Sequence, residues 1–147
     1  MKYILDTNII SLLGAESNGG IITNRLYSLS DSDILCVSVL TIYEETYGIK
    51  NSNDNARKSR FAKNIDFIKK YFQIIPLDLK EADIYADLKV AYKNHTGITP
   101  KDAKKNDIDL LIASSAIAEN AILVSNDKIF EVIAKLDNRL KFENWIC

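Results

Sequence analysis

The chain has 147 residues, of which 47% are apolar and 27% charged, and its formal net charge is −1. This balance suits one globular domain spanning residues 1–147 and excludes a globally disordered chain. No apolar run approaches the roughly 18 residues of a membrane span. We expect no signal peptide, because the first apolar run stops at Asp6. The near-neutral charge does not by itself indicate a polyanion partner.

Short apolar runs with β-branched and aromatic members predict the strands. In chain order they cover residues 2–5, 34–39, 73–75 and 122–124, and residues 140–142 add a candidate edge strand. Residues 61–72 carry apolar side chains at 4-3-4 spacing, which predicts an amphipathic helix with its charges outward. Further helices are predicted over residues 84–92 and 112–117, and glycine-rich or polar loops at 19–20, 51–55 and 96–100.

Apolar strands separated by helices are typical of βαβ units. The sequence therefore predicts a single α/β domain, with a mostly parallel central sheet of four to five strands flanked by helices. The two cysteines, Cys36 and Cys147, lack CxxC spacing, so we expect reduced thiols in a cytoplasmic protein and no zinc site or disulfide framework. The single histidine, His95, stands near an expected helix end, and we expect it at the surface.

Acidic residues follow the predicted strands in positions that matter for ligand binding. Asp6 ends the first strand, Asp127 follows the fourth, and Glu44 and Glu45 lie one to two turns into the helix that leaves Val39. Open parallel sheets bind ligands beyond the carboxyl ends of their strands. We therefore expect these acids to converge on one sheet edge.

Asp109 comes from the start of a helix instead. Ile112, Ala113 and Ala116 follow it at three, four and seven residues, so its carboxylate shares the face that must pack on the core. Burying a lone carboxylate is costly unless it is paired or binds a metal ion. Asp107 lies on another side of the same helix and is expected to face outward or to cap it.

Each acid also has a purely structural interpretation. Asp6 and Asp127 can cap the helices that follow them, and Asp109 can partner a cap at Asn106. Glu44 or Glu45 can be surface charge, and helical phase alone does not choose between them. Taken together, four carboxylates without histidine or thiolate suit hard cations such as Mg²⁺ or Mn²⁺.

Basic residues are concentrated in two segments. Residues 50–70 contain seven lysines and arginines against Asp54 and Asp66, and Lys101, Lys104 and Lys105 precede Asp109. A solvated helix face explains such a run as well as a phosphate-binding surface does. If a nuclease centre exists, Arg57, Arg60 and these three lysines are the candidates for contacting RNA phosphates.

Four ordered blocks of the sequence resemble the PIN-domain ribonucleases, in particular the VapC-type toxins of toxin–antitoxin pairs. The blocks are residues 3–8 (YILDTN), 38–48 (SVLTIYEETYG), 109–113 (DLLIA) and 124–128 (VSNDK), and residues 144–146 (NWI) resemble the usual chain ending. The second block places its glutamate four residues before a glycine, and this register selects Glu44. The sequence departs from many relatives at residues 128–130 (KIF), where they carry an arginine or a further acid.

The resemblance implies an endoribonuclease that cuts single-stranded RNA by metal-activated water and leaves a 5′ phosphate and a 3′ hydroxyl. Asp6, Asp109 and Asp127 would then hold the metal ions, and Glu44 would complete the catalytic set. Thr7, Asn8 and Ser125 are placed to orient these carboxylates or their waters, although ordinary turn and cap chemistry explains them equally well. The resemblance also implies a cognate antitoxin that blocks the acidic pocket, and a homodimer.

Other classes of protein fit less well. A haloacid-dehalogenase-type phosphatase needs a second aspartate where this chain has Asn8, and a phosphoacceptor receiver domain needs an aspartate where the middle strands end in Val39 and Pro76. The serious alternative is a PIN-like RNA-binding or scaffold module with a catalytically silent centre. The presence of all four acids argues against it.

Overall fold

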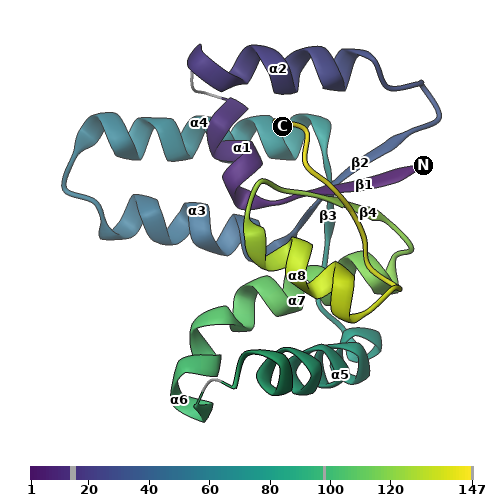
Figure 1. The fold of residues 1–147 in the computed structure, drawn as a ribbon. Helices are drawn as coiled ribbons and strands as arrows, with labels where there is room; N and C mark the ends of the chain where they lie inside the picture. Colours follow the sequence, from purple (N-terminus) through teal and green to yellow (C-terminus); the bar gives the residue numbers. More distant parts are fainter. Residues whose placement is uncertain (14–15, 98, 147) are drawn as a thin grey trace.

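Five parallel strands form the centre of the protein in the computed structural model, which describes residues 1–13, 16–97 and 99–146 (Figure 1). The order of the strands across the sheet is β3-β2-β1-β4-β5, and every neighbouring pair is parallel. Their bounds are β1 Lys2–Leu5, β2 Ile34–Ser38, β3 Gln73–Ile75, β4 Ile122–Val124 and β5 Lys141–Glu143.

Helices connect the strands and cover both faces of the sheet. They are α1 Thr7–Leu13, α2 Glu16–Tyr27, α3 Val39–Asn51, α4 Asn55–Tyr71, α5 Leu79–Thr96, α6 Pro100–Ala103, α7 Asp107–Ala118 and α8 Lys128–Leu136, with the 3₁₀ turn η1 Lys104–Asn106 before α7. In Figure 1, α1, α2 and α4 lie on one side of the sheet and α5, α7 and α8 on the other. Among the described helices, none is long and apolar enough to cross a lipid bilayer.

Alternating side chains of the strands divide the core in two. In β1, Ile4 packs with α5, α7 and α8, whereas Tyr3 and Leu5 pack with α1, α2 and α4. The same alternation separates Cys36 from Val37 in β2. Because both faces are covered, these strands are apolar along their whole length, which is the pattern that made them visible in the sequence.

Local polar residues define where several helices begin. Ser38 and Asp54 accept backbone N–H groups at the starts of α3 and α4, and Asp78 forms a reciprocal capping box with Glu81 at the start of α5. At the other end of α5, Gly97 adopts a φ of 65°, a left-handed conformation that glycine tolerates without strain.

The predicted fold class is confirmed, and the predicted strands occur in the predicted places. Two strands differ by one residue: β2 ends at Ser38, because Val39 opens α3, and the edge strand β5 covers Lys141–Glu143 instead of residues 140–142. Buried Cys36 is a free thiol and His95 is exposed in the last turn of α5, as expected, whereas Cys147 lies outside the described residues.

The loop predicted at residues 19–20 is wrong, because these glycines lie within α2. Glycine disfavours a helix by about 1 kcal/mol relative to alanine. Ile22 in the same helix is fully buried in the core cluster that also contains Leu5 and Ile68. Tertiary packing of this kind outweighs the local propensity on which the sequence prediction was based.

Candidate active site

The chain order of the sheet creates a switch point between β1 and β4. From β1 the chain moves outward through β2 and β3, and then returns to the other side of β1 to form β4. At such a switch point the connections after neighbouring strands leave in opposite directions and open a site at the carboxyl edge. Asp6 follows β1, Asp127 follows β4, and Glu44 lies in α3 directly after β2.

Asp109 reaches the same edge by a different route. It lies in the first turn of α7, the helix that leads into β4. A helix that leads into a parallel strand runs back along the sheet, so its start lies at the carboxyl edge of the strands. Asn106, at the cap position of α7, makes no side-chain cap hydrogen bond, so the capping-box interpretation of Asp109 is wrong.

Asp6 is the most buried acid of the four, with 4% of its surface exposed. Its Oδ2 accepts a hydrogen bond of 2.9 Å from the Ser125 hydroxyl. The pKa of Asp6 is raised to about 6, chiefly by burial. The hydrogen bond from Ser125 lowers this pKa, and the negative charges of Glu44 and Asp127 raise it.

Asp109 carries the second perturbed carboxyl group. Burial raises the pKa of Asp109 to about 7, and the charges of Asp6, Asp127 and Glu44 contribute in the same direction. Asp109 is thus subject to repulsion from all three of the other candidate acids. The four carboxylates therefore lie within electrostatic reach of one another, although they come from widely separated parts of the chain.

Glu44 is held by the hydroxyl group of Thr7, which is itself bonded to the hydroxyl of Thr41. Thr7 Oγ1 donates a hydrogen bond of 2.8 Å to Glu44 Oε1, and the hydroxyls of Thr7 and Thr41 lie 3.0 Å apart. Since Thr7 has a single hydroxyl hydrogen, Thr41 is the donor in the second bond. The carboxylate of Glu44 is in this way fixed beside the residue that follows Asp6.

Glu45 has a different environment. It is 1% exposed, and its Oε2 accepts a hydrogen bond of 3.3 Å from Asn64 of α4. Its Oε1 is buried without a hydrogen-bond partner among the described residues, and burial raises the pKa of Glu45. The structure thus directs Glu44 to the loop after β1 and Glu45 toward α4, a choice that helical phase left open.

Asp127 combines two roles in the structure. It is the cap of α8, where its Oδ1 accepts the backbone N–H of Ile129 at 3.1 Å, so the capping interpretation holds for this acid. Its own N–H donates to Ser125 Oγ at 3.0 Å. Ser125 therefore joins the loop after β4 to the carboxylate after β1.

The four carboxylates have no counter-ion of their own. Among residues 1–13, 16–97 and 99–146, no lysine, arginine or histidine forms an ion pair with Asp6, Glu44, Asp109 or Asp127. Within the same residues, no three acidic, histidine or cysteine side chains are already in a metal-binding geometry. The donor set of four oxygen ligands, two of them with raised pKa, fits a hard divalent cation that would draw the side chains together.

The remaining predicted residues are exposed side chains of α1, of α4 and of the segment before α7. Asn8 is exposed at the start of α1, and Arg57 and Arg60 are exposed on α4. Lys101, Lys104 and Lys105 are exposed just before α7, where Lys105 pairs with Asp102 at 3.7 Å.

Asp107 lies at the surface with 32% of its side chain exposed, and it accepts hydrogen bonds from Tyr85 at 2.7 Å and from Lys89 at 2.9 Å. Both partners belong to α5. The contact ties the start of α7, and with it Asp109, to the neighbouring helix.

Thr41 is the site residue that the sequence prediction missed. It is fully buried and supplies the hydrogen bond to Thr7 that stabilises the Glu44 arrangement. The signal was present, because Thr41 precedes Glu44 by three residues and so shares its side of a helix. A polar residue in that position is consistent with a buried hydrogen-bond network.

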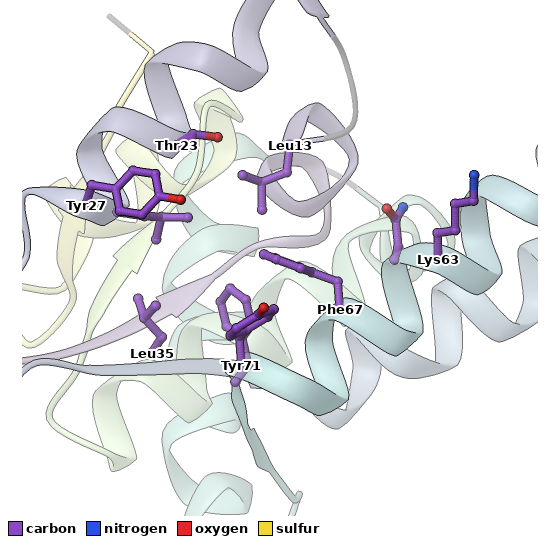
Figure 2. Close-up of a pocket in the computed structure, with 10 residues that line it drawn as sticks. Leu13, Thr23, Tyr27, Leu35, Lys63, Phe67 and Tyr71 are labelled. Carbon is purple, nitrogen blue, oxygen red and sulfur yellow. The ribbon is translucent and has the colours of Figure 1, made fainter.

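A second concave feature lies away from the acids. A pocket of about 590 Å³ opens between α2, β2 and α4, and Figure 2 shows Leu13, Leu35, Phe67 and Tyr71 bordering it. Tyr27 at its rim is 84% exposed and Tyr71 is 56% exposed. Exposed aromatic side chains around an apolar hollow are typical of a surface that binds another molecule.

Fold and site together define an α/β protein with an edge of four carboxylates at the switch point of a parallel sheet. The chain belongs to the PIN-domain family, because the model of the PIN domain matches residues 3–136.

Relatives within the family match nearly the whole chain. The chain is 32% identical to Ribonuclease VapC2 of Rickettsia felis over 146 residues, which cover 99% of this chain and 98% of the relative. It is also 32% identical to Ribonuclease VapC of Rickettsia bellii over 139 residues, or 93% of this chain and 94% of the relative. Among solved structures, VapBC2 of Rickettsia felis bound to a promoter DNA fragment matches with a TM-score of 0.77 and 30% identity, covering 99% of each chain.

Proposed function

We propose that this chain is a metal-dependent endoribonuclease that hydrolyses phosphodiester bonds in RNA, and that it is the toxin of a type II toxin–antitoxin pair. The observation that carries the proposal is the mutual electrostatic effect of four carboxylates without a cationic partner among the described residues. Folding brings these four negative charges close together, which costs free energy. A bound cation would offset that repulsion, as an internal ion pair otherwise would. The names of the two Rickettsia relatives, both called ribonucleases, support RNA as the substrate.

Each residue has a defined part in the proposed reaction. Asp6, Asp109 and Asp127 would hold Mg²⁺ or Mn²⁺, and Glu44 would orient the attacking water through its free oxygen. The bound cation would lower the pKa of a water molecule bound to it and would neutralise negative charge on the phosphate. Ser125 keeps the Asp6 carboxylate oriented, and Thr7 with Thr41 keeps Glu44 in place.

Substrate binding needs positive charge outside this acidic edge. Arg57 and Arg60 of α4 and the lysines 101, 104 and 105 supply exposed cations that would contact phosphates without reading sequence. The proposal places the protein in the cytoplasm, where RNA substrates of this kind occur.

The decisive experiment compares the parent protein with Asp6→Asn on a total RNA pool with Mg²⁺, followed by mapping of the cleaved ends. We expect the parent to leave 5′ phosphates and 3′ hydroxyls, chelator to abolish cleavage, and Asp6→Asn to reduce it by at least 100-fold. Asp66→Asn, which neutralises an exposed acid of α4, is the matched control and should cleave like the parent. Cleavage by Asp6→Asn at the parental rate contradicts the proposal, and RNA that shifts on a gel but stays whole identifies the silent binding module instead.

A partner protein completes the proposal. The related Rickettsia felis structure is described as VapBC2, a complex bound to promoter DNA. By analogy we propose a cognate antitoxin for this chain, with the apolar pocket between α2 and α4 as a place for its side chains (Figure 2), and a homodimer of the toxin. Co-purification of the chain with the product of the adjacent gene, and loss of RNA cleavage in that complex, would test this part.

A further inference from the structure

The helix α7, which carries Asp109 in its first turn, begins without a side-chain cap. Asn106 stands at the cap position and makes no side-chain cap hydrogen bond. In the preceding turn η1, Lys105 pairs with Asp102 at 3.7 Å, an exposed contact that contributes little to stability. A helix start whose backbone N–H groups lack side-chain acceptors frays readily. The position of Asp109 therefore depends on other contacts of this turn.

A network of three side chains lies at the same turn. Asp107 Oδ1 accepts a hydrogen bond of 2.7 Å from the Tyr85 hydroxyl and one of 2.9 Å from Lys89 Nζ. Lys89 Nζ also donates to the Tyr85 hydroxyl at 3.1 Å, so each of the three groups is bonded to the other two. The carboxylate at the start of α7 is thus held by two donors of α5 that also hold each other.

The helix α5 gives this network firm support. Its Leu88 is buried in the same core cluster as Ile112 and Ala113 of α7, and Tyr85 packs against that cluster. The two helices lie side by side in Figure 1. The donors therefore come from a helix that the core holds in place, whereas the acceptor belongs to the uncapped turn.

Asp109 faces away from this network. It follows Asp107 by two residues, so the two side chains are about 200° apart around the axis of α7, given about 100° per residue. The charges of Asp6, Asp127 and Glu44 repel Asp109, which favours unwinding of the turn and exposure of this carboxylate to solvent. The bonds between Asp107 and α5 keep the turn helical and so keep Asp109 directed at the other acids.

A cation binds more tightly to ligands that are held in place before it arrives, because less order then has to be created on binding. Within the described residues, no three acidic, histidine or cysteine side chains already have metal-binding geometry, so side chains must still adjust around a cation. We propose that Lys89 and Tyr85 are positioning residues of the metal site, which act through Asp107 to hold the first turn of α7, and with it Asp109, at the acidic edge. This inference rests on the proposed function.

The test measures metal binding in the absence of RNA. Titration calorimetry gives the affinity of the metal-free protein for Mn²⁺ in the parent, Lys89→Ala, Tyr85→Phe and Asp107→Ala. We expect each substitution to lower this affinity about five-fold, less than the roughly 10-fold or more that follows loss of a group bonded to a ligand itself. The sign is informative, because removal of a lysine near a cation site would by charge alone raise the affinity. The midpoint of thermal unfolding should fall by no more than about 4 °C, because partly exposed ion pairs contribute little stability.

Three further variants separate positioning from general effects. Lys80 of the same helix pairs with Glu119 at the other end of α7, and Lys80→Ala should bind Mn²⁺ within about two-fold of the parent. Lys89→Arg keeps a charged donor for Asp107 and should restore the affinity that Lys89→Ala loses. The double variant of Lys89→Ala with Asp107→Ala should bind Mn²⁺ as Asp107→Ala alone does, because Lys89 acts through that carboxylate.

Two results overturn the positioning role. The first is parental affinity for Mn²⁺ in Lys89→Ala and Tyr85→Phe. The second is an equal loss of affinity in Lys80→Ala and Lys89→Ala, which assigns the effect to the general packing of α5 on α7. Failure of the proposed function is a separate result, since a parent protein that binds Mn²⁺ and cleaves no RNA refutes the nuclease alone. A parent protein that binds no Mn²⁺ overturns the metal site and the positioning role together.

Discussion

The Ser125 hydroxyl joins the two strand-end acids. It donates to Asp6 at 2.9 Å and accepts the N–H of Asp127 at 3.0 Å, and the residue is fully buried. One side chain thereby orients a carboxylate after β1 and the loop after β4. Because this hydroxyl is buried and bonds to both residues, we expect its loss to change the orientation of Asp6 and Asp127 and little else.

Replacing Ser125 with alanine should therefore weaken metal binding more than it weakens the fold. We expect Ser125→Ala to lower the affinity for Mg²⁺ or Mn²⁺ by about 10-fold or more, in the range found when groups that orient ligands are lost. Calorimetric titration of the metal-free protein measures this affinity. Ser114→Ala is the control, since the buried hydroxyl of Ser114 donates to the carbonyl of Leu110 within α7; equal metal affinity in both variants would contradict the role of Ser125.

At this scale the sequence predicted which acids lie within electrostatic reach of one another, but not how they are held. The strand ends identified Asp6 and Asp127, and the apolar stripe identified Asp109. The choice between Glu44 and Glu45 depended on the family register, because both lie on plausible sides of α3. Only the packing of α4, which brings Asn64 to Glu45, separates them physically, and no local pattern encodes that contact.

At the scale of elements, α3 and α4 form a hairpin whose close contact depends on one glycine. A Cβ added to Gly48 would lie 2.7 Å to 3.0 Å from three ring carbons of Phe61. Real Cβ atoms do not approach other carbons this closely, so the ring or the helix would have to move. The glycine four residues after Glu44 thus has a physical reason, which is the approach of the helix that carries Arg57 and Arg60.

We expect Gly48→Ala to destabilise the protein by about 1–3 kcal/mol, the usual cost of overpacking a well-packed contact. Denaturant unfolding followed by circular dichroism measures the free energy of unfolding. Gly20→Ala in α2 is the matched control, because nothing lies within 4 Å of its added Cβ. That variant should be unchanged or up to about 1 kcal/mol more stable, since alanine favours a helix over glycine; a Gly48→Ala protein as stable as the parent would refute the contact.

Elements with strong periodicity were predicted well, and elements whose sequence contradicts their structure were not. The 4-3-4 spacing predicted the apolar side of α4, whose Ile68 is indeed fully buried. The two glycines of α2 predicted a loop, because local propensity takes no account of Ile22 in the core. Val39 was assigned to β2, since its β-branched side chain concealed the cap at Ser38 that starts α3.

For the whole molecule, the perturbed carboxyls predict how stability depends on pH. In the folded, metal-free protein Asp6 and Asp109 have pKa values of about 6 and about 7, against a reference of 3.8. Between pH 4 and pH 7 the carboxyl groups of Asp6 and Asp109 are therefore more protonated in the folded chain than in the unfolded chain. For this reason the free energy of unfolding falls as the pH rises from about 4 to about 7. The contribution of Asp6 to this change is on the order of 3 kcal/mol.

Thermal unfolding in the presence of chelator at pH 5 and pH 7.5 measures this slope. Asp109→Asn removes one of the two groups and should be less sensitive to pH than the parent. Mg²⁺ at a hundred-fold excess over its dissociation constant should restore about 2.7 kcal/mol at pH 7.5, because the cation binds only the folded, ionised site. A metal-free parent that gains stability between pH 5 and pH 7.5 would contradict the raised pKa values.

At this scale the sequence predicted the α/β class and the parallel sheet, since apolar strands covered on both faces leave a clear pattern. The strand order needed the structure, because nothing local states that β4 pairs with β1 rather than with β3. The apolar pocket between α2 and α4 also escaped prediction. Its lining residues are spread from Leu13 to Phe72, and their exposure depends on how three elements meet.

The position of β4 beside β1 also determines when this protein becomes able to act during its own synthesis. The ribosome joins Asp6 long before the loop after the neighbouring strand, since Ser125 and Asp127 follow Asp6 by 119 and 121 residues in the chain. A nascent or prematurely terminated chain therefore carries three of the acids without a closed centre. On the proposed assignment of the acids, unfinished copies would lack a complete metal site and would cut no RNA.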